Sequence, residues 1–283
     1  MRTLGERYRA EGRTVGLVTT SYLSDATPAA FAAHAASRFD RASIRTAYLA
    51  PGGPDPLLGG GLDLPRSMLE AAGFVVVEDA AGLAAATTSG VARLAGVFGL
   101  YLPYEFDGLG PYPSLAGTTC AALDVAGRNA RASFLLIEGG RIDRACHAND
   151  LARCIGEVVG FERAVAAAVE WAVGRDDALI IVAADHETGG LEVPEDRGLW
   201  RWPVVRWSTT GHTAVPITVW AWGRWADRAL GVEHLTDVHD GLADPAFPRP
   251  RITSMVRAKD GLALTWLAIS GRVYQVQCSA SAA

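Results

Sequence analysis

Apolar runs and helical segments alternate along most of this chain. Short runs rich in apolar and β-branched residues predict strands at 14–20, 74–77, 134–137, 178–183 and 216–221. Between them, an Ala-rich segment with Pro28 as its first helical residue and a long segment over 151–173 have the period of helices. This alternation predicts an α/β fold, a layered α/β/α domain with a mostly parallel sheet.

Two segments rich in glycine and proline interrupt the pattern. Residues 51–64, PGGPDPLLGGGLDL, predict a loop. Residues 244–250, DPAFPRP, predict a linker, and the runs ITSMVRA, LALTWLAI and VYQVQCS after it predict the first strands of an incomplete β-sandwich. We therefore expect an α/β domain over residues 1–243 and the start of an all-β module over 244–283.

The composition supports a folded domain and excludes several classes of protein. With 49% hydrophobic and 20% charged residues, the chain can bury a large core. Its 26 basic and 31 acidic residues give a net charge of −5, which provides no broad positive field for nucleic acid or anionic membranes. No run approaches the ~20 apolar residues of a membrane span, and the first residues, MRTLGERYRAEGRT, lack the apolar core of a signal peptide. The four cysteines form no CxxC pair and leave the redox compartment open.

Polar side chains are concentrated next to four of the predicted strands. They are Asp25 and Thr27 after the first strand, Glu138, Asp143 and His147 after the third, Asp185 and His186 after the fourth, and His212 before the fifth. Ligand sites of open α/β sheets gather outside the carboxyl ends of the strands. We therefore expect these side chains to lie close together.

Carboxylate, hydroxyl and imidazole groups are the ligands that suit Zn²⁺ beside Mg²⁺. Asp143 and His147 are four residues apart, so they face the same way if a helical turn follows their strand. Asp185 and His186 are adjacent and can reach one ion only where the backbone turns sharply. Two metal ions about 4 Å apart would bind the attacking and leaving oxygens of a phosphoryl transfer.

Each cluster taken alone has an ordinary structural explanation. An Asp-His pair commonly caps a turn, and Asp143 with His147 could be a surface pair on a helix. Thr27 before Pro28 is a good helix N-cap, a role that is compatible with metal binding. Because four such clusters accompany predicted strands, the sequence favours a metal site over four unrelated turns.

Four blocks of this sequence resemble the ordered signature blocks of the alkaline phosphatase family. They are DATPAAFAAH with Arg38, EGGRIDRACH, ADHETGGL and TTGHTAVPITVWAWG, and the similarity extends from about Glu11 to about Asp240. The resemblance implies an alkaline phosphatase-like fold and hydrolysis of phosphate monoesters with two zinc ions and one magnesium ion.

The resemblance also implies a role for each matching residue. Asp143, His147 and His212 would bind the first zinc ion, Asp185 and His186 the second, and Thr27 and Glu138 the magnesium ion. Arg38, on the helix that begins at Pro28, would hold the phosphate through two parallel hydrogen bonds. Asp25 would lie in the second shell of the magnesium ion, and Arg144 would contact phosphate through water.

The family's nucleophile has no counterpart in this chain. In the family, a serine that becomes phosphorylated, and a further bridging aspartate, precede the DATPAA block, and neither Ser21 nor Ser24 has the corresponding place. We therefore expect the nucleophile upstream of this chain, as part of a phosphomonoesterase. Two alternatives are a catalytically inactive metal-binding protein and a related metal-dependent phosphodiesterase.

The resemblance further implies a small-molecule phosphate monoester as substrate and permits a homodimer. Family members usually work in the periplasm or outside the cell, so we expect that location. The all-β segment at the end of the chain resembles the start of a fibronectin type III module.

Overall fold

A computed structural model of the chain describes all residues except 1, 92, 129–131, 244–250, 259–260 and 268–283. Within that part, the helices are α1 (Leu4–Ala10), α2 (Ala26–Ala32), α3 (Arg41–Leu49), α4 (Arg66–Ala71), α5 (Ala80–Ser89), α6 (Leu115–Gly127), α7 (Arg141–His147), α8 (Leu151–Ala172) and α9 (Leu235–Ala243). Two 3₁₀ helices are η1 (Glu105–Asp107) and η2 (Ala226–Gly231).

Thirteen strands are seen in the described residues. They are β1 (Thr14–Tyr22), β2 (Leu57–Gly60), β3 (Val75–Val77), β4 (Leu94–Val97), β5 (Ser133–Glu138), β6 (Leu179–Ala183), β7 (Glu187–Thr188), β8 (Leu191–Glu195), β9 (Val204–Trp207), β10 (His212–Thr213), β11 (Val219–Gly223), β12 (Arg251–Ala258) and β13 (Gly261–Leu267). The chain divides into one compact unit of residues 1–175 and 184–218, and a second of residues 176–183 and 219–283. The boundary expected at residue 243 remains a prediction.

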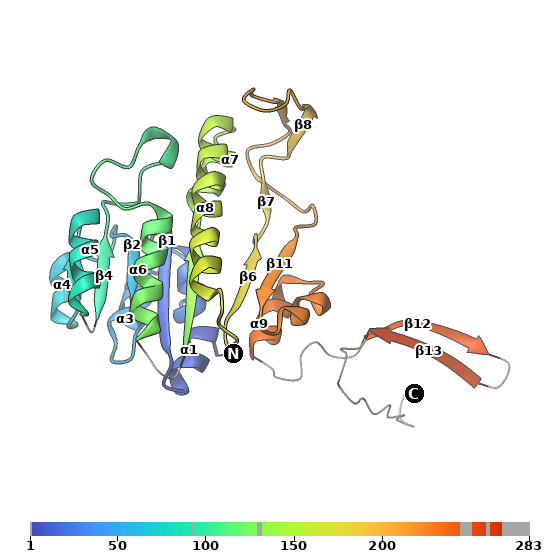
Figure 1. Cartoon of the computed structure of the whole chain (residues 1–283), viewed down its shortest axis with the longest axis horizontal. Coiled ribbons are helices and arrows are strands. Elements are labelled where there is room, and N and C mark those ends of the chain that lie inside the picture. The colour runs from blue at the N-terminus through green and yellow to red at the C-terminus, as the bar shows by residue number, and fades with distance from the viewer. Residues whose placement is uncertain (1, 92, 129–131, 244–250, 259–260, 268–283) are drawn as a thin grey trace. The chain divides into compact units, whose positions relative to one another are not determined.

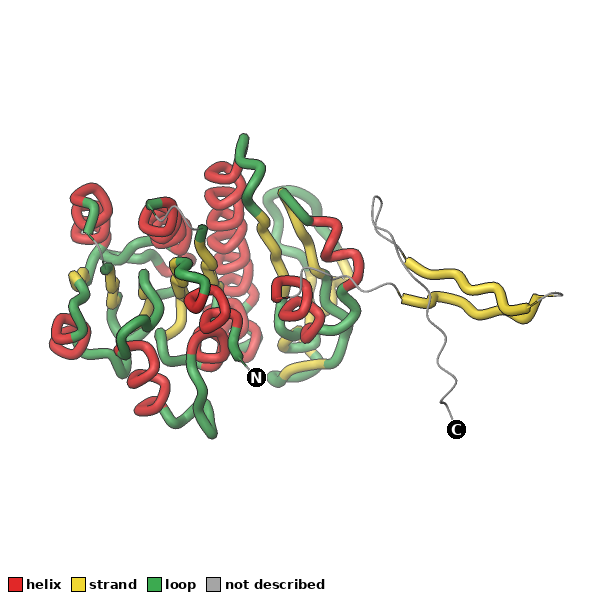
Figure 2. The backbone as a smooth tube through the Cα atoms, turned by 90° about the horizontal axis from the view of Figure 1, so that it is seen from below, coloured by secondary structure: helices red, strands yellow, loops and turns green. Residues whose placement is uncertain are grey.

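The first unit is built on a five-stranded parallel sheet in the order β3-β4-β2-β1-β5 (Figure 1). Helices cover both faces of this sheet (Figure 2). Neighbouring residues of a strand point to opposite faces, so Leu17 joins a core with α2, α3 and α4, whereas Val18 joins a core with α5, α6 and α8. The predicted α/β fold with a mostly parallel sheet is confirmed.

The expected loop over residues 51–64 is partly wrong, because β2 lies inside it. Leu57 and Leu58 are fully buried, one in each core. The glycines that suggested a loop are needed for close packing, since a Cβ on Gly60 would overlap the carbonyl oxygen of Leu100. Glycine in this strand therefore reflects a close approach of backbones rather than a turn.

The helix expected to begin at Pro28 starts earlier and ends sooner. Asp25 caps α2 by accepting a hydrogen bond from the Ala26 amide at 2.8 Å, which makes Pro28 the third helical residue. Ala33 then adopts an extended backbone and is buried in the core beside α2. Packing thus ends the helix within an alanine-rich sequence. The prediction that Arg38 lies on this helix is therefore wrong, because Arg38 lies between α2 and α3.

The second unit contains two antiparallel strand pairs, β6 with β11 and β12 with β13. The runs at 178–183 and 216–221 therefore pair antiparallel with each other. β12 and β13 correspond to the first two strands expected after the proline cluster, and the third lies outside the described residues. None of the described helices combines the length and hydropathy needed to cross a membrane.

Candidate metal centre

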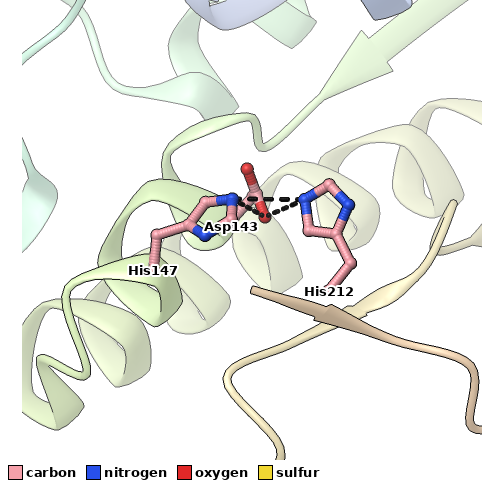
Figure 3. A group of neighbouring side chains, drawn as sticks. All are labelled: Asp143, His147 and His212. Carbon is pink, nitrogen blue, oxygen red and sulfur yellow. Dashed lines mark hydrogen bonds and ion pairs between the residues drawn. The ribbon is translucent and has the colours of Figure 1, made fainter. Parts of the chain in front are cut away.

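Three ligand atoms converge between α7 and β10. The Nε2 atoms of His147 and His212 are 3.2 Å apart, and they lie 3.3 and 3.6 Å from Asp143 Oδ1 (Figure 3). Ligands at 2.0–2.1 Å from a tetrahedral zinc ion would be about 3.4 Å from one another. All three side chains keep between 39% and 49% of their surface exposed, so the group is accessible from solvent. The donor set and its spacing fit a zinc ion with an open coordination position.

The sequence after β5 explains why Asp143 and His147 face this point. The Gly139-Gly140 pair lets the backbone turn from the strand into α7, where a Cβ on Gly140 would lie 3.1 Å from Ser21 and 3.2 Å from Glu138. The Arg141 amide donates to Thr20 Oγ1 at 3.1 Å and ties the start of α7 to β1. A spacing of four residues then places both side chains on one helix face, as predicted.

His212 reaches the same point through a short antiparallel pairing. β10 pairs with β7 so that His212 lies opposite Thr188 and Thr213 opposite Glu187. The Thr213 hydroxyl donates to the Glu187 carboxylate, which also accepts the Gly190 and Leu191 amides at 3.2 and 3.1 Å. These bonds, led by the one from Thr213, hold the pKa of Glu187 below its ordinary value. Glu187 thereby stabilises the turn from β7 into β8 and, through Thr213, links that turn to β10.

Hydrogen bonds determine which imidazole nitrogens are free to bind a metal. His147 Nδ1 contacts the carbonyl oxygen of Thr210, which can only accept, so Nδ1 carries a proton and, in the neutral ring, Nε2 is the nitrogen with the free lone pair. Thr188 donates its hydroxyl proton to Asp143 Oδ1 at 2.6 Å and must accept from His186 Nδ1 at 3.1 Å. In the neutral ring His186 Nε2 is therefore the unprotonated nitrogen, and Thr188 connects His186 to Asp143.

Asp185 and His186 lie beside the first three residues. His186 Nε2 is 3.2 Å from Asp185 Oδ2, and its ring stacks on that of His212 with centroids 3.6 Å apart. The turn between β6 and β7 brings the two adjacent side chains together, as their proposed ligation of one ion requires. They offer one nitrogen and one carboxylate next to the Asp143 group.

Thr27 and Glu138 also meet. Glu138 lies opposite Thr19 in the pairing of β1 with β5 and accepts the Thr19 hydroxyl at 2.6 Å, and the Thr27 side chain is near enough to lower the pKa of Glu138. Burial raises the pKa of Glu138, and the Thr19 and Thr27 side chains offset part of that effect. A partly desolvated carboxylate beside a hydroxyl favours a hard cation such as magnesium, because the cation stabilises the charged form.

Asp25 holds two arginines. Arg38 Nη2 donates to its Oδ1 at 2.6 Å and Arg144 Nη2 to its Oδ2 at 3.1 Å, while Ser21 Oγ donates to Oδ2 at 2.7 Å. Although burial acts to raise the pKa of Asp25, hydrogen bonds from Ser21, the Ala26 amide and Arg38 bring that pKa below its ordinary value. Asp25 is thus a stable anion that orients two guanidinium groups.

The two serines near this group are not exposed. Ser21 and Ser24 each retain 1% of their surface, and Ser24 Oγ donates to Asp63 Oδ2 at 2.5 Å. Each hydroxyl donates a hydrogen bond to a carboxylate of the protein, Ser21 to Asp25 and Ser24 to Asp63. That neither serine is the nucleophile stays a prediction.

Sequence reasoning missed Thr188 and Thr19, the two threonines that hydrogen-bond candidate ligands. The sequence could have indicated Thr188, because residues two apart in extended backbone point to the same side and His186 is two residues before Thr188. Thr19 gave none, since its partner Glu138 is 119 residues away and only the strand register brings them together.

Comparisons with known proteins identify relatives of this chain. A family model described as "Alkaline phosphatase" matches residues 1–53 and 57–202. Alkaline phosphatase 3 of Bacillus subtilis is 32% identical over 213 residues, which cover 71% of this chain and 46% of that protein. Streptomycin-6-phosphate phosphatase of Streptomyces griseus is 32% identical over 314 residues, covering 84% of this chain and 70% of that protein.

Solved structures share the fold. A cold-active alkaline phosphatase from Shewanella sp. superposes with a TM-score of 0.71 at 24% identity, covering 80% of this chain and 74% of that one. The alkaline phosphatase of the Antarctic bacterium TAB5 gives a TM-score of 0.68 at 25% identity, with 80% and 69% covered. The chain spans less than half the length of Alkaline phosphatases 3 and 4 of Bacillus subtilis, at 46% and 43%.

Proposed function

This chain belongs to the alkaline phosphatase family, and we propose that its protein is a metal-dependent phosphomonoester hydrolase. The observation that carries the proposal is the convergence of Asp143, His147 and His212 in the same unit as the Asp25–Arg38–Arg144 group. The first group is suited to bind a metal ion and the second to bind a phosphate, and metal-dependent phosphate hydrolysis requires both.

We assign two zinc ions to the imidazole and carboxylate donors. Asp143, His147 and His212 would hold the first, and Asp185 with His186 would contribute to the second. Bound zinc would lower the pKa of water and polarise a phosphoryl oxygen. The chain's own contribution is to present unprotonated Nε2 atoms, which the bonds of His147 to Thr210 and of His186 to Thr188 support.

We assign one magnesium ion to Thr27 and Glu138, with Asp25 in its second shell. Support comes from the raised pKa of the partly desolvated Glu138 carboxylate. A variant of the TAB5 alkaline phosphatase has been solved with magnesium in its M3 site. In this chain the Thr27 side chain lies near enough to Glu138 to lower its pKa, so the two groups can serve one ion.

Arg38 is the proposed phosphate-binding residue. Its bond to Asp25 uses one guanidinium nitrogen and leaves other N–H groups for two phosphate oxygens. Asp25 fixes the direction of the side chain, and Arg144, held by the same carboxylate, would reach the phosphate through water. We further propose a phosphoserine intermediate on a serine outside this chain.

The remaining parts of the proposal concern the whole protein. Its substrate would be a small-molecule phosphate monoester, with no specificity for nucleic acid, which agrees with the net charge of −5. It would work in the periplasm or outside the cell, and it could form a homodimer.

The test compares this chain with a version extended by the sequence encoded upstream of Met1, both supplied with zinc and magnesium. We expect the extended protein to hydrolyse p-nitrophenyl phosphate faster than bis(p-nitrophenyl) phosphate, and to stop when a chelator removes the metals. Turnover by this chain alone should be near background. Faster hydrolysis of the diester, or no metal-dependent monoester hydrolysis in the extended protein, would refute the proposal. Rapid turnover by this chain alone would refute the placement of the nucleophile.

Thr188 should act as a positioning residue for both zinc sites. Replacing it with valine keeps its shape but removes the hydroxyl that joins His186 to Asp143. We expect zinc affinity, measured by competition with a chromogenic chelator, to fall by about 10- to 100-fold, as is usual for outer-shell partners.

Two control variants make this result specific. Thr188→Ser keeps the hydroxyl and should retain zinc affinity, while Thr46→Val removes a helix-surface hydroxyl that bonds only the Ala42 carbonyl among described contacts. If Thr188→Val binds zinc as tightly as the unmodified chain, the positioning role is wrong.

A further inference from the structure

Two cysteines of the first unit lie in contact next to the candidate metal centre. Cys146 Sγ and Cys154 Sγ are 3.2 Å apart, and the side chains are only 8% and 7% exposed. Bond formation requires the sulfurs to approach by about 1.2 Å, to the 2.05 Å of a disulfide. Both are free thiols in this structure, and each is the other's hydrogen-bonding partner.

The pair joins the end of one helix to the beginning of the next. Cys146 is the second-last residue of α7, directly before the candidate ligand His147, and Cys154 is in the first turns of α8. The intervening turn is ordered: the Asp150 amide donates to the Ala145 carbonyl at 3.0 Å, and the Cys154 amide to the Asp150 carbonyl at 2.9 Å. Close sulfurs in a fixed backbone favour ring closure.

The surroundings of the sulfurs are apolar. Ala145 is buried with them, and Tyr104, Ile142 and Trp207 pack against the group. The one cluster of metal-ligating side chains among the described residues, Asp143, His147 and His212, includes no cysteine. A disulfide is itself apolar and would occupy this core without an unsatisfied polar group.

We propose that Cys146 and Cys154 form a disulfide that fixes the metal-binding end of α7 to α8. The oxidant is a small-molecule disulfide such as glutathione disulfide. One cysteine thiolate attacks a sulfur of the oxidant, breaking its S–S bond and releasing one thiol. The second cysteine thiolate then attacks the protein sulfur of this mixed disulfide and releases the second thiol. Two electrons and two protons pass to the oxidant, which becomes two thiols.

Burial determines when this exchange takes place. The oxidant reaches the sulfurs while the chain folds or when the turn between α7 and α8 opens, so oxidation of the folded protein is slow. Cys120, which is exposed on α6, should react with the same oxidant first. Once closed, the bond is protected from reductants by the same packing.

The bond can be tested by peptide mapping. In a Cys120→Ala/Cys278→Ala background, Cys146 and Cys154 are the only thiols. Trypsin cleaves after Arg144, Arg153 and Arg163, so the two cysteines fall in separate peptides, ACHANDLAR and CIGEVVGFER. After refolding with glutathione disulfide, we expect both thiols to be lost and the two peptides to appear linked, lighter by two hydrogen atoms than their sum. Unlinked peptides, with free or separately glutathionylated cysteines, would overturn the proposal.

The effect of the bond is measured on the same protein before and after reduction. The disulfide closes a loop of only nine residues, and we expect it to raise the midpoint of thermal unfolding by about 5 °C. A Cys146→Ala/Cys154→Ala variant in that background should show no change on reduction. If reduction leaves the midpoint of the linked protein unchanged, the bond does not fix α7 to α8.

A second measurement depends on the proposed function, whereas the peptide mapping does not. Because His147 follows Cys146, the linked protein should retain zinc against a chelator about 3- to 10-fold longer than the reduced protein, a smaller effect than loss of an outer-shell partner. A linked peptide with no bound zinc would contradict the proposed metal site and leave the disulfide intact. Zinc binding without the linked peptide would overturn the disulfide alone.

Discussion

Zinc affinity is expected to fall by at least about 100-fold when His212 is replaced by alanine, since losing a direct ligand should cost at least as much as losing an outer-shell partner. The Nε2 atom of His212 lies 3.2 Å from that of His147, and removing it leaves one nitrogen and one carboxylate at the first site. The His212 ring also stacks on His186, so the second pair of donors loses a neighbour that limits its movement. Zinc bound per chain, measured by atomic emission, should decrease by one ion or more.

A histidine outside the site provides the matched control. His34 lies after α2 and bonds Glu6 at 3.0 Å on the protein surface, so His34→Ala removes an imidazole without changing the metal ligands. Its zinc content should equal that of the unmodified chain, and in the upstream-extended protein it should keep monoester hydrolysis. His212→Ala should bind less zinc than the unmodified chain, and in the extended protein it should lose monoester hydrolysis. Unchanged zinc content and affinity in His212→Ala would show that His212 is not a ligand.

Local spacing predicted the two members of the Asp143–His147–His212 group that lie on one helix. Asp143 and His147 are four residues apart after an apolar run, and the helix period alone places them on one face. His212 is 65 residues from His147, and no local rule joins them. The resemblance to a known family supplied that link, and the pairing of β10 with β7 gives its physical basis.

The errors share one cause, which is that packing outweighed local preference. Glycines suggested a loop where β2 runs through the middle of the sheet, because only a residue without a side chain fits beside Leu100. Alanines suggested a helix long enough to carry Arg38, yet Ala33 leaves the helix and is buried in the core. Tertiary contacts of this kind are absent from a local window of sequence.

The position of Arg38 after α2 bears directly on its function. If Arg38 lay on a helix, the helix backbone would set the direction of its side chain. In this structure the hydrogen bond to Asp25 orients the Arg38 guanidinium. The Arg38 side chain is 52% exposed, so its guanidinium can meet a ligand from solvent. The carboxylate that holds it is buried and has a lowered pKa, so the pair persists into mildly acidic solution.

Replacing Arg38 with alanine should therefore weaken phosphate binding by about 10- to 100-fold, the loss expected when a charged donor of hydrogen bonds is removed. The measurement is the affinity of the zinc- and magnesium-loaded chain for inorganic phosphate, by calorimetry. Arg38→Lys keeps the charge but cannot donate two parallel hydrogen bonds, so it should recover only part of the affinity. Arg66→Ala is the control, because Arg66 pairs with Glu70 and Glu78 on the surface.

The two replacements separate charge from geometry. If Arg38→Lys binds phosphate as tightly as the unmodified chain, electrostatic attraction alone explains the role of Arg38. If Arg38→Ala binds phosphate within twofold of the unmodified chain, Arg38 is not the phosphate-binding residue, and Arg144, which shares the Asp25 carboxylate, becomes the candidate. A loss in Arg38→Ala that Arg38→Lys only partly restores is the result that two parallel hydrogen bonds require, because a lysine presents a single ammonium group where arginine presents a planar pair of donors.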